Sequence, residues 1–222
     1  METEKLFYQD AYLRETTAKV LECRQGKHGY EIVLDKTCFY PEGGGQPGDH
    51  GTLNGIQVVD THEKDGLVLH DTKEPIEVGT EVTAVIDWDR RFDLTQQHSG
   101  EHMVSGVVHR IYGYDNVGFH MGADMVTIDF SGELTEQQLR DVEQEVNEKI
   151  WLDSPVKCWY PSPEELGGIP YRSKKELTGK VRIVEFPGAD ICACCGTHVA
   201  HTGEIGLVKI LSVEKFHSGV RV

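Results

Sequence analysis

The sequence has no hydrophobic run approaching the ~18 consecutive apolar residues that a membrane span needs, and only 38% of its residues are hydrophobic. The opening segment, METEKLFYQD, lacks the basic-then-apolar pattern of a secretory signal peptide. The six cysteines are scattered between Cys23 and Cys195 rather than set in a small disulfide framework. These absences argue against a membrane protein. They favour a reducing, cytoplasmic compartment in which cysteines are free thiols or metal ligands.

Basic residues are also few: 22 Lys and Arg stand against 37 Asp and Glu, which gives a net charge of −15. Phosphate binding needs lysine and arginine, so this balance argues against a nucleic-acid partner. The stretch 171–222, however, carries eight basic and five acidic residues, so charge alone is weak evidence either way. The candidate phosphate contacts are Arg90, Arg91, Lys174, Lys175, Lys180 and Arg182.

The length of 222 residues fits one large or two modest domains. Residues 1–88 are predicted to be mostly β, because short apolar runs alternate with turn signals. Asn54-Gly55 and Asp65-Gly66 are strong hairpin signals, and apolar and polar residues alternate in Glu81–Ile86. Short strands at this spacing indicate a small barrel or sandwich. We place the domain boundary after residue 88, which leaves residues 89–222 as the second domain.

The second domain is predicted to be α/β. Residues 93–111 form a helix whose apolar side is expected to consist of Met103, Val104, Val107 and Ile111. The roughly opposite side carries His98, Glu101, His102, Ser105 and His109.

A second helix is expected from about Thr135 to Trp151, where Thr135 and Gln138 make a capping box. Strands are expected at Val181–Glu185 and Ile205–Val213.

Two pairs of potential metal ligands stand far apart in the sequence, each with three residues between its members. The first is His98 and His102, in QQHSGEHMV, and the second is Cys194 and His198, in CCGTHV. Helix positions i and i+4 lie on one face, so His98 and His102 can bind one ion. Imidazole and thiolate ligands select zinc over magnesium or calcium. The sequence therefore predicts one zinc ion where two distant segments meet.

Two related readings of this helix are disfavoured. His109 lies about 10 Å along the helix axis from His102, which is too far for the same metal ion. A metalloprotease of the HExxH type would need a glutamate directly after the first histidine, whereas Glu101 precedes the second.

The glycine-rich stretch FYPEGGGQPGDHG spans residues 39–51. Glycines allow a backbone to approach a ligand closely and to adopt positive φ. Gly44 and its neighbours can offer backbone N–H donors, and the Gln46 side chain can both donate and accept. The stretch lacks the Lys-Ser/Thr ending of a phosphate-binding P-loop. A tight turn between strands is the alternative interpretation.

The segments FYPEGGGQPGDHG, DWDRRFDLTQQHSGEHMVS, VTIDF, GKVRIVEF and CCGTHVAHTGEIGLVKI, in this order, resemble freestanding alanyl-tRNA editing proteins of the medium-length type. These proteins are related to the editing domain of alanyl-tRNA synthetase. The resemblance implies an N-terminal β-barrel joined to an α/β, zinc-binding editing domain of the threonyl/alanyl-tRNA synthetase type. It implies zinc ligands at His98, His102, Cys194 and His198. This chain has Cys195 where the family commonly has glycine, and Cys192 is near, so either remains an alternative to Cys194.

The resemblance also implies a reaction. An alanine pocket rejects serine only about 10²-fold, so accurate translation needs a second site that hydrolyses the wrong ester. We expect zinc-assisted deacylation of Ser-tRNA(Ala) in trans, with glycine as an alternative amino acid. A zinc-bound water is the expected nucleophile; zinc that only positions the substrate amine is the other option. The expected substrate contacts are Thr37, Gly44, Gln46 and Gln97, with the Thr37 hydroxyl recognising serine.

Other functions fit part of the pattern. Four protein ligands complete a tetrahedron, as in structural zinc sites, so a non-catalytic zinc-stabilised module that binds tRNA or protein is the main alternative. A hydrolase with Cys195 as nucleophile lacks a clearly placed base. We expect one zinc ion per chain, mischarged tRNA(Ala) as partner, no membrane association and a monomer.

Overall fold

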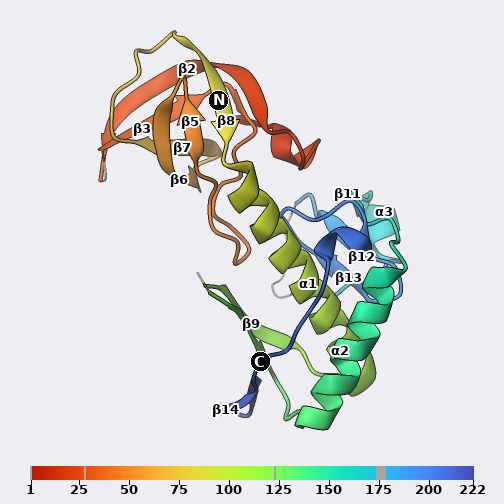
Figure 1. The fold of residues 1–222 in the computed structure, drawn as a ribbon. Coiled ribbons are helices and arrows are strands. Elements are labelled where there is room, and N and C mark those ends of the chain that lie inside the picture. The colour runs from red at the N-terminus through yellow and green to blue at the C-terminus, as the bar shows by residue number, and fades with distance from the viewer. Residues whose placement is uncertain (1, 28, 123, 174–178) are drawn as a thin grey trace. The chain divides into compact units, whose positions relative to one another are not determined.

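The computed structural model describes residues 2–27, 29–122, 124–173 and 179–222, and the prediction of a mixed α and β fold is confirmed (Figure 1). The chain divides into two compact units, Met1–Leu94 and Thr95–Val222. The division falls within α1 (Trp88–Tyr112), and the boundary predicted after residue 88 lies at the start of this helix. None of the helices in the described ranges is long and apolar enough to cross a membrane.

Six strands of the first unit pair in the closed order β2-β3-β7-β6-β5-β8. The barrel closes because β8 pairs with β2 on one side and with β5 on the other. A short parallel pair, β1 with β4, precedes the glycine-rich stretch. The elements of this unit are β1 (Glu4–Lys5), η1 (Leu6–Tyr8), β2 (Glu15–Gly26), β3 (Gly29–Leu34), β4 (Lys36–Thr37), β5 (Gly51–Leu53), β6 (Ile56–Lys64), β7 (Leu67–Thr72) and β8 (Glu81–Ile86).

The hairpins of this unit follow directly from their turn residues. Asn54 and Gly55 join β5 to β6 with φ of 48° and 84°. Asp65 and Gly66 join β6 to β7 with φ of 52° and 79°. Two consecutive left-handed residues match the right-handed twist of paired strands, so both predicted hairpins are confirmed. The alternation predicted for β8 is also present, with Val82, Ala84 and Ile86 buried.

The described residues of the second unit form two antiparallel sheets and two long helices. One sheet has the order β14-β15-β10-β9 and the other has the order β11-β12-β13. Buried residues from α1, α2, β10 and β12 form one continuous core. Its elements after α1 are β9 (Asn116–Met121), β10 (Val126–Phe130), α2 (Glu136–Trp151), β11 (Lys157–Trp159), α3 (Pro163–Leu166), β12 (Ile183–Phe186), β13 (Asp190–Ala193), η2 (Thr202–Ile205), β14 (Glu214–Phe216) and β15 (Gly219–Arg221).

The second helix begins as predicted. Thr135 is the N-cap of α2, its hydroxyl accepts from the backbone N–H of Gln138, and the Gln138 side chain bonds back to Thr135. The expected apolar side of α1 is correct for Met103, Val104 and Val107, which are buried. It is wrong for Ile111, which is 42% exposed near the end of the helix.

The strand predicted at Ile205–Val213 is wrong. Ile205 ends the short helix η2, and no strand forms over residues 206–213. The side chains of α2 bind this extended segment instead: Asn147 exchanges two hydrogen bonds with the backbone of Val208, and Glu143 accepts from the backbone N–H of Ile210. The alternating apolar residues are therefore explained by packing of Val208 and Ile210 against the core beside a helix.

Arg91 and Asp49 form a fully buried ion pair in the first unit. Arg91 is 0% exposed and its Nε donates to both carboxylate oxygens of Asp49 at 3.0 Å. Its Nη1 and Nη2 also donate to the backbone carbonyls of Ala11 (3.0 Å) and Cys38 (2.8 Å). Asp49 in turn accepts from the backbone N–H of Tyr40 at 2.7 Å. The pair thus holds both ends of the glycine-rich stretch against the first turn of α1.

We expect Arg91→Gln to lower the free energy of unfolding by about 3–5 kcal/mol, because it leaves the Asp49 carboxylate buried without its partner. Denaturant titration measures this change. Arg24→Gln is the control, since the Arg24–Glu31 pair lies at the surface and is expected to change stability by less than about 1 kcal/mol. Similar losses in the two variants would contradict the role assigned to Arg91.

Candidate metal centre and glycine-rich turn

The second unit brings the four predicted ligands together. Nitrogen and sulfur atoms of His98, His102, Cys194 and His198 all lie within 4.8 Å of one another. Cys194 Sγ is 3.5 Å from His98 Nε2 and 3.4 Å from His198 Nε2. The three imidazoles are buried and Cys194 is partly buried. This cluster could hold a metal ion.

The two elements that carry the ligands differ in kind. His98 and His102 lie one turn apart on α1, as predicted, whereas Cys194 and His198 lie on the loop that follows β13. Arg182 fixes that loop, because its Nη1 donates to the carbonyls of Cys194 (3.0 Å) and Gly196 (2.9 Å). The backbone N–H of Gly196 also donates to Cys194 Sγ at 3.3 Å.

Hydrogen bonds at the far ring nitrogens fix how two of the imidazoles point. Ser99 donates its hydroxyl hydrogen to the carbonyl of Thr95 (2.7 Å), so it can only accept from His198 Nδ1, at 3.2 Å. His102 Nδ1 lies 2.9 Å from a carboxylate oxygen of Asp190, which also only accepts. Both rings therefore carry hydrogen on Nδ1 and turn Nε2 toward the cluster, the orientation that metal-binding histidines require.

The electrostatics of the cluster favour the metal-binding forms of Cys194 and His198, but not of His102. Burial lowers the pKa of His102, yet the Cys194 thiolate and the hydrogen bond to Asp190 outweigh burial and raise it well above its usual value. Burial alone raises the pKa of the Cys194 thiol, but the His98 and His102 imidazoles and the hydrogen bonds from His102 and His198 outweigh burial and hold the pKa well below its usual value. Burial is the main reason that the pKa of His198 falls to about 3. A thiolate and a neutral imidazole are the forms that bind metals.

The neighbouring cysteines differ from Cys194. Cys195 is exposed. Cys192 is buried, and burial raises the pKa of its thiol to about 11. It lies near His102 and Asp190 instead of the three imidazoles. Only Cys194 among these three is grouped with all three histidines, although the ligand assignment itself stays a prediction.

Two other polar residues of α1 are already engaged. Glu101 is buried and accepts from the Ser105 hydroxyl (2.6 Å) and from the Asn116 amide. His109 lies outside the cluster, with Nδ1 at 3.0 Å from Asp115. These pairings agree with the exclusion of Glu101 as an HExxH base and of His109 as a ligand.

Sequence reasoning missed the residues that hold the ligands, chiefly Ser99, Asp190 and the pairing of Arg182 with the loop. A metal-binding histidine commonly bonds a carboxylate at its outer nitrogen, but no spacing in the sequence identifies Asp190 as that carboxylate. Ser99 and Arg182 carry no signal either, because their partners are distant in the sequence.

In the first unit, the Thr37 side chain is fully buried and bonded to His70. His70 Nδ1 lies 2.9 Å from the Ile32 carbonyl, so this nitrogen must donate. His70 Nε2 therefore accepts the Thr37 hydroxyl hydrogen at 2.9 Å, while Thr37 Oγ1 accepts from the backbone N–H of Phe39 at 3.1 Å. One acceptor position remains on Thr37 Oγ1 among the described residues.

The glycine-rich stretch forms a tight turn. Gly43 and Gln46 exchange backbone hydrogen bonds of 3.0 Å, and Gly44 and Gly45 between them have φ of 61° and 86°. A Cβ added at Gly44 would meet nothing within 4 Å, so this backbone is open on that side. Gln46 is buried, whereas Gln97 is exposed on α1. Contact of Gly44, Gln46 and Gln97 with a substrate stays a prediction.

The candidate phosphate contacts fare differently. The prediction that Arg91 and Arg182 contact phosphate is wrong, because both side chains are buried and bonded to groups of their own unit. Lys180 is exposed and Arg90 is half-buried. Lys174 and Lys175 lie outside the described residues.

Comparison with known proteins gives two family matches. Residues 2–90 match the family described as tRNA synthetases class II (A). Residues 181–221, which include Cys194 and His198, match the threonyl and alanyl tRNA synthetase second additional domain.

Similar proteins extend over nearly the whole chain. An alanyl-tRNA editing protein AlaX-L of Pyrococcus horikoshii is 38% identical over 221 residues, covering 96% of this chain and 55% of that protein. The alanyl-tRNA editing protein Aarsd1 of Bos taurus is 35% identical over 228 residues, covering 93% and 50%. An alanine–tRNA ligase of Halorubrum lacusprofundi is 35% identical over 237 residues, covering 99% and 25%. The chain thus spans about half the length of the curated editing proteins it matches.

The buried His70 predicts a pH dependence of stability. Burial lowers its pKa from 6.5 to about 4, so below pH 6.5 the unfolded chain binds a proton that the folded chain does not. The stability that depends on neutral His70 is fully present above pH 6.5. As the pH falls to 4, the free energy of unfolding decreases by about 3 kcal/mol. Urea unfolding of wild type and His70→Gln from pH 7 to pH 4 measures it. The difference between their unfolding free energies should change by this amount; parallel pH profiles would contradict the assignment.

Proposed function

We propose that this chain, which is similar to alanyl-tRNA editing proteins over nearly its whole length, is an aminoacyl-tRNA deacylase that removes serine from mischarged tRNA(Ala), with glycine as an alternative amino acid. The bond cut is the ester between the amino acid and the ribose of the tRNA. One zinc ion per chain is bound by His98, His102, Cys194 and His198. The observation that carries the proposal is the convergence of these four ligand atoms in one buried cluster.

The donor separations support zinc. With Zn–S of about 2.3 Å and Zn–N of about 2.0–2.1 Å, tetrahedral geometry gives sulfur–nitrogen separations of about 3.6 Å. The two Sγ–Nε2 distances here are 3.4 and 3.5 Å. Three imidazoles and one thiolate also form a donor set that zinc prefers over magnesium and calcium.

The chain's own residues prepare the centre for this ion. Ser99 and Asp190 accept the Nδ1–H of His198 and His102, which leaves the two Nε2 lone pairs for the ion. Arg182 holds the backbone that carries Cys194. When bound, zinc supplies a Lewis acid that can lower the pKa of a water toward about 7 or hold the substrate amine.

Serine recognition is assigned to the Thr37 hydroxyl. Its hydrogen is donated to His70, so toward a substrate it is an acceptor, which suits the donor hydrogen of a serine side chain and offers alanine nothing. Thr37 has no exposed surface in this structure, so the proposal requires its surroundings to open before a serine side chain can reach the hydroxyl. A desolvated acceptor discriminates more strongly than one already bonded to water. Gly44, Gln46 and Gln97 are proposed to position the substrate or the attacking water.

The proposed partner is mischarged tRNA(Ala), and the proposed setting is the cytoplasm, with the chain as a monomer. The acidic net charge of −15 suits weak, salt-sensitive RNA binding rather than a broad basic surface. Lys180 is an exposed candidate for a phosphate contact.

A second candidate function is supported by the ligand count. Four protein ligands complete a zinc tetrahedron, as in structural sites, whereas catalytic zinc usually keeps one position open. A non-catalytic zinc-stabilised module that binds tRNA or protein would use the same cluster. Hydrolysis of a mischarged tRNA separates the two functions.

We expect wild-type protein to deacylate Ser-tRNA(Ala) much faster than Ala-tRNA(Ala). Chelation of zinc should abolish the activity, and added zinc should restore it. His102→Ala should lower the rate by more than about 100-fold, because losing a ligand costs more than the 10–100-fold that losing its outer partner costs. His109→Ala, on the same helix but outside the cluster, should retain activity. Stoichiometric zinc with no hydrolysis of either substrate would favour the non-catalytic module.

We expect Thr37→Val to lower the ratio of Ser-tRNA(Ala) to Ala-tRNA(Ala) deacylation by about tenfold, the equivalent of one lost hydrogen bond. Thr37→Ser keeps the hydroxyl and should keep most of the ratio. Thermal unfolding of both variants is the folding check, because Thr37→Val also removes the partner of His70. An unchanged ratio in folded Thr37→Val would limit Thr37 to a structural role.

A further inference from the structure

The geometry points to Arg172 and Asp190 as positioning residues that set the metal affinity of the cluster by fixing the His102 ring. This inference rests on the proposed zinc centre. Neither residue is a proposed ligand, and Arg172 acts only through Asp190.

Asp190 and His102 make the inner contact. Asp190 is 5% exposed and its Oδ2 lies 2.9 Å from His102 Nδ1. A carboxylate accepts only, so the hydrogen stays on Nδ1 and the lone pair stays on Nε2, at the other side of the ring. The negative charge also makes the ring a better electron donor to a cation. An imidazole free to rotate or change tautomer would offer that lone pair only part of the time.

Arg172 makes the outer contact in a two-point geometry. Its Nε donates to Asp190 Oδ1 at 2.7 Å and its Nη2 donates to Oδ2 at 2.8 Å. The carboxylate plane is therefore fixed, and both its oxygens have a charged donor. Without Arg172, the buried carboxylate would lose its main compensating charge and turn toward other donors.

The backbone keeps Arg172 in register with the ligand loop. The backbone N–H of Arg172 donates to the Ile191 carbonyl (2.8 Å), and the Ala193 N–H donates to the Arg172 carbonyl (2.9 Å). Arg172 thus forms an isolated parallel bridge with Cys192 in β13, two residues before Cys194. The arginine, the carboxylate and the cysteine ligand are therefore held by one short piece of extended backbone.

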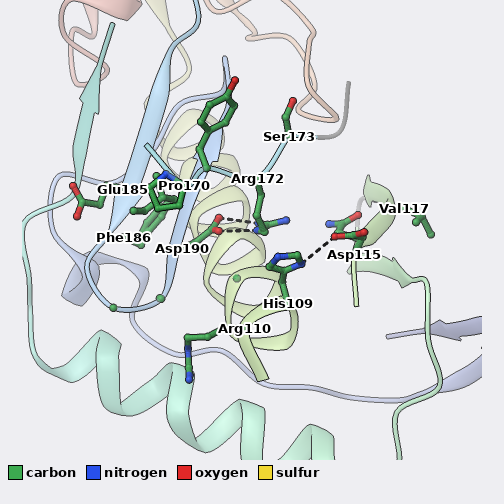
Figure 2. Close-up of a pocket in the computed structure, with 16 residues that line it drawn as sticks. His109, Arg110, Asp115, Val117, Pro170, Arg172, Ser173, Glu185, Phe186 and Asp190 are labelled. Carbon is green, nitrogen blue, oxygen red and sulfur yellow. Dashed lines mark hydrogen bonds and ion pairs between the residues drawn. The ribbon is translucent and has the colours of Figure 1, made fainter. Parts of the chain in front are cut away.

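A cavity of about 880 Å³ borders this ion pair. Arg172 and Asp190 both line it, together with His109, Asp115 and Tyr171 (Figure 2). In Figure 2 the Arg172 and Asp190 side chains meet on the cavity wall, while His109 pairs separately with Asp115. Asp190 thus contacts both the cavity and His102, while none of the four proposed ligands lines the cavity.

The same unit provides a matched control. Arg221 and Asp129 form a two-point pair of the same geometry, with contacts of 2.6 and 2.8 Å, between β15 and β10, although it is more exposed. Neither residue belongs to a potential metal group among the described residues. Its loss tests the general cost of breaking such a pair.

The test measures zinc affinity of the metal-free protein by competition with a chromophoric chelator. Arg172→Gln and Asp190→Asn should each bind zinc about 10–100-fold more weakly than wild type. Arg221→Gln and Asp129→Asn should bind zinc like wild type even where thermal unfolding shows a similar loss of stability. Absorption spectra of the cobalt-substituted proteins should change for Arg172→Gln and remain unchanged for Arg221→Gln.

Wild-type affinity in the Arg172 and Asp190 variants, or an equal loss in the control variants, would overturn the inference. If Arg172→Gln fails to fold, Arg172→Lys is the alternative variant, because it keeps the charge but makes a single contact. It should bind zinc with intermediate affinity. Wild-type affinity of Arg172→Lys would overturn the role of the two-point contact. Failure of the proposed function has a different signature. Wild type that binds no zinc removes both proposals, whereas zinc binding that weakens in the Arg172 variant without tRNA deacylation removes only the deacylase.

Discussion

The convergence of one thiol and three imidazoles in a buried space is the constraint on which the second unit depends. Cys194, His98, His102 and His198 place their ligand atoms within 4.8 Å of one another, and such polar atoms are costly to bury without partners. The fold meets this cost at the outer nitrogens, where Ser99 and Asp190 each accept one hydrogen bond. The inner atoms lie close to one another, and a bound cation could satisfy them all at once.

The first unit also buries polar groups, and there an ion pair compensates their loss of water. Arg91 and Asp49 are both fully buried, and each also bonds to backbone that precedes the glycine-rich turn, at Cys38 and Tyr40 respectively. Each of the three guanidinium nitrogens of Arg91 donates to a buried or partly buried acceptor, which ties the turn to the first part of α1. In both units, therefore, a buried charged group orders the segment proposed to act on the substrate. The negative net charge of the chain does not report this, since the groups that matter are internal and paired.

Local signals were read correctly where the physical cause is local. Positive φ at Asn54-Gly55 and Asp65-Gly66, and the capping box at Thr135, depend on residues only a few positions apart. The segment 206–213 shows the opposite case. Its alternating apolar residues resemble a strand, but Glu143 and Asn147 of α2 supply the hydrogen bonds that a neighbouring strand would supply. Ile111 was predicted to be buried from its helical spacing alone. It is exposed because spacing does not show where the packing partners of a helix end.

The sequence by itself determined the ligand types, their order and the helical spacing of His98 and His102, since an i, i+4 pair faces one way in any helix. It also indicated the family, through motifs that lie in the same order along the chain. Tertiary structure alone decided that Cys194, rather than Cys192 or Cys195, meets all three histidines. It alone decided that Asp190, Arg172, Ser99 and Arg182 support the cluster, and that Arg91 is an internal ion-pair partner. The physical reason is the same in each case: a side chain's partner is chosen by packing and by the cost of burying charge, and neither is encoded in its near neighbours.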